Sequence, residues 1–375
     1  MMAILIARYA VALGMPAWKV GLLGTAALIG TAGATYLVGR YVESVGRRRL
    51  LVWGALLAVA TGLGYAGSTA FPALLVGAFL GTANPTSGDV SAFLPIEQAI
   101  LAQEVGPAGR VGLFARFNVA GSLAGGFGAL VTGLTGVVEL TGLSEEGAIR
   151  LFFAGYALIG VLTWALVRRL PQSAELSAPA GARRSGLGPS KGRVWTLSAL
   201  FATDSFAGGI VVQSIIALYL LREFDLDPAV TGAVFFAASF LQAISFLLSA
   251  RLSMRFGLVN TMVFTHLPSN ALLALVAFAP TAPLAIGALL ARSFLSQMDV
   301  PPRQTLVVSV VEPEERAAAA AYTGLTRSLA STPGPSLGGA LFGLWGGAPF
   351  VVCAALKSGY DVALWGLFRK VQPRG

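Results

Sequence analysis

The sequence predicts an all-α polytopic membrane protein made of two six-helix bundles related by pseudo-twofold symmetry, with an incomplete first helix. Hydrophobic residues make up 55% of the 375 residues and charged residues only 11%, whereas a soluble domain has about 25% charged residues. Apolar runs of about 20 residues recur, and each can cross a hydrocarbon core about 30 Å thick. These runs lack the alternation of barrel strands, so helices must satisfy the backbone in lipid. The third observation is an internal duplication.

The duplication is clearest around an acidic residue in each half. The segment 89–98 (DVSAFLPIEQ) has a shorter counterpart in 299–304 (DVPPRQ), which pairs Asp89 with Asp299. Past the gap, Glu97 aligns with Arg303 and Gln98 with Gln304. The same offset continues through the next span. Ionisable side chains within membrane spans are costly unless they face protein or water, so both copies are candidates for function.

The predicted elements follow from the apolar runs and the polar breaks. Residues 1–13 are too short to span a bilayer and align only with the end of the seventh span. We therefore expect a truncated first helix, and twelve spans in the intact protein. The halves are 1–167 and 194–375, joined by a cytoplasmic linker at 168–193 that is rich in positive charge. The remaining spans of the first half are 20–41, 50–66, 73–101, 111–138 and 149–167, and those of the second half begin near 194, 229, 259, 284, 317 and 350.

The net charge of +9 reflects orientation and not a nucleic-acid partner. Arg and Lys gather in every second connection and in the C-terminal tail, whereas the connections 67–72, 279–283 and 346–349 contain none. The positive-inside rule then predicts a multi-pass protein of the cell (cytoplasmic) membrane with a cytoplasmic C-terminus. A single Cys353 and a single His266 argue against disulfides and against a metal site. No nucleotide-binding or enzyme motif occurs, so we expect no cofactor and no enzymatic activity.

The connection between the second and third spans carries a motif. Residues 39–49 read GRYVESVGRRR, with Gly39, Glu43, Gly46, Arg47 and Arg48 at the key positions. This resembles the signature loop of the major facilitator superfamily, with Glu43 in place of the usual Asp. In addition, 121–128 (GSLAGGFG) and 334–339 (GPSLGG) resemble the glycine-rich fifth-span motif of that superfamily's proton-coupled exporters. Small residues that only let helices pack closely explain these glycines equally well.

The resemblance implies two six-helix bundles with a substrate site between them near the bilayer midplane, lined by spans one, four, seven and ten. On that basis Asp89 or Asp299 would carry a coupling proton. Glu97 and Arg303 would form an ion pair that breaks as the halves rock. Alternatively, Arg303 would hold an anionic substrate group. The competing interpretation is that these charges only neutralise one another and fix helix packing.

Other polar residues complete the predicted site. Asp204 and Gln213 lie on the seventh span, while Gln98 and Gln304 neighbour the paired charges. Arg116 and Arg327 are candidate counter-ions. Lys357 and Asp361 are spaced i,i+4, so we expect them to pair with each other. His266 and Asn270 are also spaced i,i+4, and a hydrogen-bonded helix contact is favoured over a proton relay at His266.

These features predict a secondary active transporter that works by alternating access as a monomer in a lipid bilayer. A proton is the expected coupling ion, a small organic molecule the substrate, and export the direction. Two alternatives remain open. One is a transporter of anionic metabolites centred on Arg303, and the other is a transport-inactive membrane sensor on the same fold.

Overall fold

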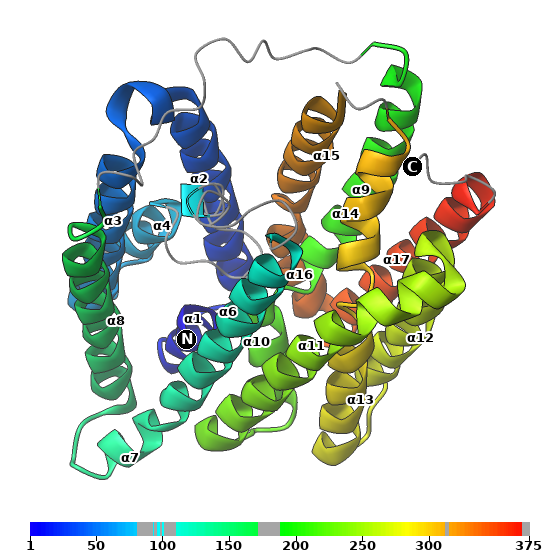
Figure 1. The fold of residues 1–375 in the computed structure, drawn as a ribbon. Helices are drawn as coiled ribbons and strands as arrows, with labels where there is room; N and C mark the ends of the chain where they lie inside the picture. Colours follow the sequence, from blue (N-terminus) through cyan, green and yellow to red (C-terminus); the bar gives the residue numbers. More distant parts are fainter. Residues whose placement is uncertain are drawn as a thin grey trace. The chain divides into compact units, whose positions relative to one another are not determined.

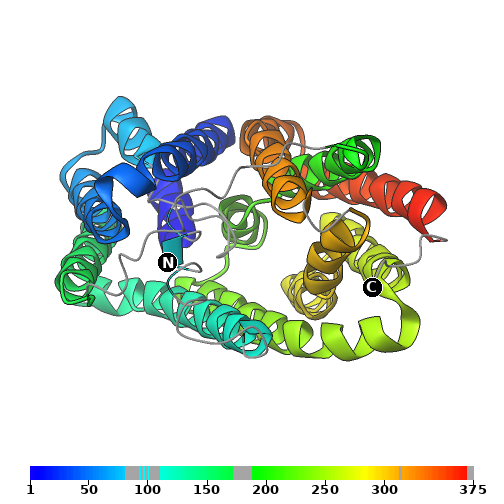
Figure 2. The ribbon, with the colours of Figure 1, turned by 45° about the horizontal axis from the view of Figure 1, so that its top comes forward.

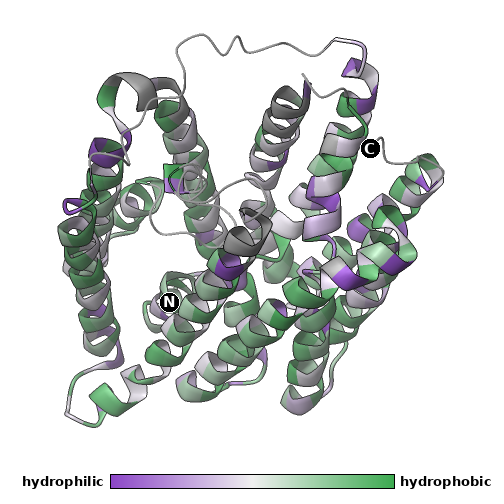
Figure 3. Ribbon diagram, in the orientation of Figure 1, coloured by the Kyte–Doolittle hydropathy of each residue, from purple (hydrophilic) through white to green (hydrophobic). Residues whose placement is uncertain are grey.

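The computed structural model describes residues 1–80, 93, 96, 97, 100, 110–171, 188–311 and 315–369. Within these ranges the chain is helical and contains no strand (Figure 1). Eight helical segments among the described residues are long and apolar enough to cross a membrane, and the hydropathy colouring shows mainly hydrophobic helices with scattered polar positions (Figure 3). The prediction of an all-α polytopic fold is confirmed.

The chain divides into two compact units. The first contains Met1–Ala182 and Val212–Ala233, and the second contains Arg183–Val211 and Val234–Gly375. The seventh predicted span therefore contributes one helix to each unit. The predicted domain boundary lies in the linker 168–193, of which residues 172–187 are outside the described ranges.

The first unit holds most of the first half of the chain and one helix from the seventh span. Its helices are α1 (Met2–Ala12), α2 (Ala17–Val45), α3 (Arg47–Gly67), α4 (Phe71–Phe79), α6 (Arg110–Gly133), α7 (Thr135–Glu139), α8 (Glu145–Val167) and α10 (Gln213–Glu223). Helix α8 starts sharply because the Ser144 side chain accepts a hydrogen bond from the Gly147 amide and two glutamates occupy its first turn. Helices α3 and α8 pack backbone to backbone, since a Cβ on Gly62 would lie 2.7 Å from the Ala157 nitrogen.

Helix α1 is fixed to the first unit by a buried cation. Arg8 is 3% exposed and lies 3.3 Å from Glu139 and 3.0 Å from Glu145. The same guanidinium also donates a hydrogen bond to Thr135. Thr135 and Glu139 belong to α7, and Glu145 is the first residue of α8, so Arg8 links α1 to both of these helices.

The second unit holds α9 (Lys191–Ile210), most of α11 (Pro228–Phe256), α12 (Leu258–Ala277), α13 (Ala282–Leu295), α14 (Val300–Ser309), α15 (Arg316–Ser331), α16 (Gly334–Leu344) and α17 (Ala348–Phe368). Its core contains Phe201, Leu306, Tyr360 and Leu364, all at most 2% exposed. This core joins α9, α12, α14 and α17, the helices that carry the candidate site. In both ribbon views α15 runs beside α9 (Figures 1 and 2).

Three of the predicted spans are each built from two helices. The breaks lie between α9 and α10, between α13 and α14, and between α15 and α16. Proline accounts for two of them, because Pro301 and Pro335 occupy the first turns of α14 and α16 and cannot donate a backbone hydrogen bond to the preceding turn. The region of α9 and α10 is nevertheless one apolar segment, Lys191–Glu223, long enough to cross a membrane.

The second glycine motif serves close packing. A Cβ on Gly338 would lie 2.1 Å from the Ile210 oxygen, and one on Gly334 would lie 2.4 Å from the Gly209 carbonyl carbon. Helix α16 therefore contacts the end of α9 directly through main-chain atoms, with no side chain between the two helices. In the first motif, a Cβ on Gly121 or Gly125 would have no neighbour within 4 Å.

Candidate functional site

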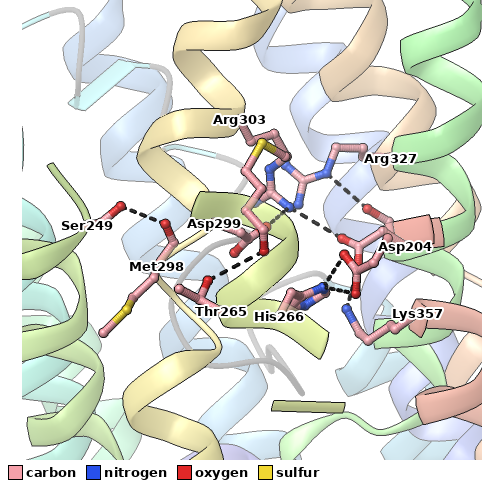
Figure 4. A network of polar contacts seen from close by, with 12 residues as sticks. Asp204, Ser249, Thr265, His266, Met298, Asp299, Arg303, Arg327 and Lys357 are labelled. Carbon is pink, nitrogen blue, oxygen red and sulfur yellow. Dashed lines mark hydrogen bonds and ion pairs between the residues drawn. The ribbon is translucent and has the colours of Figure 1, made fainter. Parts of the chain in front are cut away.

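A buried charge network lies among the helices α9, α14 and α17 of the second unit (Figure 4). The Arg303 Nη1 atom lies 3.0 Å from Asp299 Oδ2 and 3.3 Å from Asp204 Oδ2. On the other side of Asp204, the Lys357 Nζ atom donates to Oδ1 over 2.5 Å. None of these four residues is more than 8% exposed. We call Asp204, Asp299, Arg303 and Lys357 the central network.

Local structure sets the position of each member. Asp299 precedes the first residue of α14, and its carbonyl accepts the Arg303 amide hydrogen over 2.9 Å. This i,i+4 geometry places both side chains on one face of the helix. Asp204 comes from the interior of α9 and Lys357 from the interior of α17. The central network thus joins three segments far apart in the sequence.

A second group of polar contacts lies on the same helices. His266 Nδ1 is 3.0 Å from both carboxylate oxygens of Asp361, and Asn270 Nδ2 donates to Asp361 Oδ2 over 2.8 Å. His266, Asn270 and Asp361 are 4%, 1% and 0% exposed, respectively. The predicted hydrogen-bonded helix contact of His266 and Asn270 is confirmed, and it joins α12 to α17.

The central network has enough opposite charges to change ion-pair partners without leaving a buried charge uncompensated. Within the central network two carboxylates face one guanidinium and one ammonium, so the formal charges balance. Removing one partner from such a buried pair costs about 3 to 5 kcal/mol because the other charge is left without compensation. A proton or an anionic group arriving at Asp299 or Arg303 would therefore change which contacts are made, and this is the chemistry that a coupled transport site needs.

The structure brings together three of the predicted site residues, Asp204, Asp299 and Arg303. Glu97 is half-buried and belongs to the first unit, so its pairing with Arg303 stays a prediction. Gln213 is half-buried on α10, also in the first unit, and Gln304 is exposed on α14. Asp89 and Gln98 lie outside the described residues.

The residues of the predicted signature loop lie at the junction of α2 and α3. Gly39 and Glu43 are in the last part of α2, and Gly46 joins the helices with a φ of 92°, which favours glycine. Arg48 donates to the Arg168 carbonyl oxygen, and Arg47 is half-buried.

The two counter-ion candidates differ in their surroundings. The side chain of Arg116 is exposed on α6. Arg327 lies on α15, and its Nε atom donates to the Ser205 hydroxyl over 3.0 Å. Ser205 follows Asp204 on α9, so Arg327 borders the central network (Figure 4). Counter-ion roles for both remain predictions.

The expected pairing of Lys357 with Asp361 was wrong. Lys357 contacts Asp204 on α9, and Asp361 contacts His266 and Asn270 on α12. Spacing along one helix could not distinguish these partners, because contacts to neighbouring helices compete with the contact along the helix. The lysine and the aspartate inside one apolar span indicate that both side chains have polar partners within the protein, but not which partners.

Fold and site thus define a polytopic helical membrane protein with a buried charge network. The model of the Major Facilitator Superfamily matches residues 197–374, in agreement with the resemblance seen in the signature loop, and the chain has the fold of solved transporters. The uncharacterized membrane protein YJR124C of Saccharomyces cerevisiae is 26% identical over 364 residues, covering 88% of this chain and 81% of that protein.

Solved structures show the same fold along almost the whole chain. The xylose transporter XylE from E. coli aligns with a TM-score of 0.73 at 15% identity, covering 98% of this chain and 94% of that chain. The nucleoside transporter NupG gives 0.70 at 17% identity, covering 99% and 95%. The human organic anion transporter MFSD10 gives 0.62 at 20% identity, covering 96% and 88%.

Proposed function

We propose that this protein is a secondary active transporter that moves a small organic solute by alternating access, with the central network as its coupling site. The observation that carries the proposal is Arg303, which is 6% exposed and lies within 3.3 Å of two carboxylates. A static helix contact needs one partner for a guanidinium. Two carboxylates allow one to be neutralised while Arg303 stays compensated by the other.

Asp299 is the residue in the described part of the chain that we assign to the coupling proton. Among the described residues its one ionic partner is Arg303, whereas Asp204 is held by both Arg303 and Lys357. Protonation of Asp299 removes one anion from Arg303 and leaves a guanidinium donor for a substrate oxygen or for the second carboxylate. We propose export from the cell as the direction and the cell membrane as the location.

Transport by purified protein in proteoliposomes tests this function. The panel contains a sugar, a nucleoside and an organic anion, because relatives of the fold transport xylose, nucleosides and organic anions. With a pH gradient, the wild type should accumulate one class of solute at least about tenfold more than the Asp299→Asn variant does. Without a gradient, the Asp299→Asn variant should still exchange the same solute. A wild type that moves every class equally with and without the gradient contradicts proton coupling.

The matched control for this experiment is Asp225→Asn. Asp225 is exposed and has a φ of 47°, a conformation that asparagine adopts readily. The substitution makes the same chemical change as Asp299→Asn away from the central network, so gradient-driven transport should equal that of the wild type. Equal losses in both variants would indicate an unspecific effect of the substitution.

The second candidate is transport of an anionic metabolite, favoured by the forked donors of Arg303 at the centre of the network. A substrate carboxylate would then replace Asp299 at the guanidinium. In Arg303→Gln, binding of the organic anion should fall by at least about tenfold while a neutral solute is unaffected. Arg251→Gln, which changes an exposed arginine on α11, is the control. Unchanged anion binding in Arg303→Gln rejects this candidate.

A further inference from the structure

The ends of α8 and α17 carry the same short sequence pattern. Residues 164–169 read WALVRR and residues 365–370 read WGLFRK, so each helix has a tryptophan four residues before an arginine. The Arg168 Cζ atom lies 4.7 Å from the centroid of the Trp164 ring, and the Arg369 Cζ atom lies 4.1 Å from that of Trp365. A guanidinium at such a distance over an indole is held by a cation–π interaction. An arginine–tryptophan pair thus occurs once in each unit.

The arginines at these two helix ends have no anionic partner within the described part of the chain. Arg168, Arg169 and Arg369 are exposed, and none of them is in an ion pair there. Stacking on an indole occupies the face of a guanidinium, while the five N–H donors point outward in its plane. This planar set of donors fits two oxygens of one phosphate group. Both helix ends therefore present charge that suits an anionic ligand.

The first unit adds further cations beside its pair. Helices α3 and α8 pack together (Figure 1), and Arg48 at the start of α3 donates to the Arg168 carbonyl oxygen. The next residue, Arg49, is exposed, and the first turn of α3 contains no acidic residue. Two helix ends with consecutive arginines thus meet at one place, which makes this end of the α3–α8 pair a cationic patch.

The second unit combines its pair with an apolar groove. The Trp365 indole donates to Asn260 on α12 over 3.2 Å, which holds the ring at the seam between α12 and α17. A groove of about 290 Å³ lies along the same seam. Its walls are mainly small apolar side chains and include Leu267, Ala271 and Ala274 from α12 and Val351, Ala355 and Ser358 from α17.

The groove lies at the depth of lipid acyl chains. Leu267 is seven residues from Asn260, and Ser358 is seven residues from Trp365. At 1.5 Å per residue both lie about 10 Å from the helix ends toward the membrane centre. Ala355 lies about 15 Å from Trp365, which equals one leaflet of a hydrocarbon core about 30 Å thick. A hydrocarbon chain that starts at the level of Trp365 therefore reaches the groove.

We propose that each unit binds one anionic phospholipid at these helix ends, with the lipid phosphate at the arginine of the pair. In the second unit, one acyl chain lies in the groove between α12 and α17. Tryptophan is suited to the headgroup level of a bilayer, and basic side chains there attract anionic lipids. Charge selects the anionic class, because a zwitterionic headgroup brings an ammonium group close to the arginines. The inference goes beyond the proposed transport function and does not depend on it.

Native mass spectrometry of the full-length protein measures which lipid is retained. The protein is reconstituted with equal amounts of phosphatidylglycerol and phosphatidylcholine of the same acyl chains and then extracted in detergent. The wild type should retain two molecules of phosphatidylglycerol, preferred over phosphatidylcholine by at least about tenfold. Equal retention of the two lipids overturns the proposal, since the pairs would then act only as interfacial anchors. Excess inorganic phosphate should leave the lipid bound, and displacement by it would indicate a site for a soluble anion instead.

Substitutions of the arginines test the headgroup contacts. Arg369→Gln should remove one bound phosphatidylglycerol, and the double variant Arg168→Gln with Arg169→Gln should remove the other. Arg369→Lys keeps the charge but loses the stacked planar donors, so it should retain less lipid than the wild type and more than Arg369→Gln. Arg251→Gln removes the charge of an exposed arginine on α11 and is the control. An equal loss in Arg251→Gln would show that net charge alone decides, which rejects the two sites.

A substitution in the groove tests the acyl chain without changing any charge. Ala355 is exposed, and Ala355→Phe fills the groove, so this variant should retain only the lipid of the first unit. Val362→Phe is the matched control on the same helix, because Val362 is 62% exposed and does not line the groove. It should retain both lipids. Two lipids on Ala355→Phe would reject the groove as the position of the chain.

Discussion

At the scale of single residues, the central network depends on Asp204, which has two cations within 3.3 Å. Arg303 has a second carboxylate in Asp299, whereas the ionic contact of Lys357 within the described part of the chain is to Asp204 alone. Asp204 is therefore the member whose loss leaves a buried charge uncompensated. This asymmetry makes a stability prediction possible.

Asp204→Asn should destabilise the protein by about 3 kcal/mol, lowering the thermal unfolding midpoint in detergent by about 5 °C or more. The double variant Asp204→Asn with Lys357→Met removes the ammonium as well, so it should recover most of that loss. Differential scanning fluorimetry of the purified variants measures both. A double variant as unstable as Asp204→Asn would show that Lys357 is not the group left uncompensated.

The residue scale also shows what the sequence can and cannot predict. Asp299, Arg303 and Asp204 are identifiable because each is an ionisable residue within an apolar run. Placing an ionisable side chain in a membrane span is costly whatever its neighbours are. The partner of Lys357 is not identifiable, since the i,i+4 contact to Asp361 and the cross-helix contact to Asp204 satisfy the same charge. Only the three-dimensional packing of α9 against α17 decides between them.

At the scale of elements, two of the three breaks coincide with one contact. The end of α9 meets the start of α16 through Gly209, Gly334 and Gly338. A continuous apolar run predicts a span, but it does not predict where two helices replace one, because that position depends on which backbone the span approaches. The proline and glycine positions in 333–338 are the local signal for the break in the eleventh span.

Gly338→Ala should be harmful although alanine favours helices. Its Cβ would lie 2.1 Å from the Ile210 oxygen, so backbone must move, at a cost of about 1 to 3 kcal/mol. Gly343→Ala in the same helix is the control, since a Cβ there has no neighbour within 4 Å and should be neutral or stabilising. Thermal unfolding of the two variants measures the difference, and equal midpoints would refute the close contact.

At the scale of the whole molecule, the distribution of Arg and Lys predicts which side of the membrane each connection faces. The connection between α3 and α4 has none of these residues, whereas the end of α8 is followed by Arg168 and Arg169. The first should be outside and the second cytoplasmic.

Cysteine labelling on intact cells measures this orientation. The native Cys353 is fully buried, so the wild type provides a low background. Thr69→Cys should react with an impermeant maleimide, and Arg169→Cys should react only after the cells are opened. The side chains of Thr69 and Arg169 are both exposed. The reverse pattern would invert the predicted orientation.

The route of the chain between the units has a practical consequence. It passes from the first unit to the second near residue 182, returns for Val212–Ala233, and then stays in the second. Cutting within 168–193 therefore yields no two self-sufficient fragments, since the N-terminal piece lacks α10, which packs against α1 and α2. Split halves made in one cell should complement each other, and each alone should be prone to degradation.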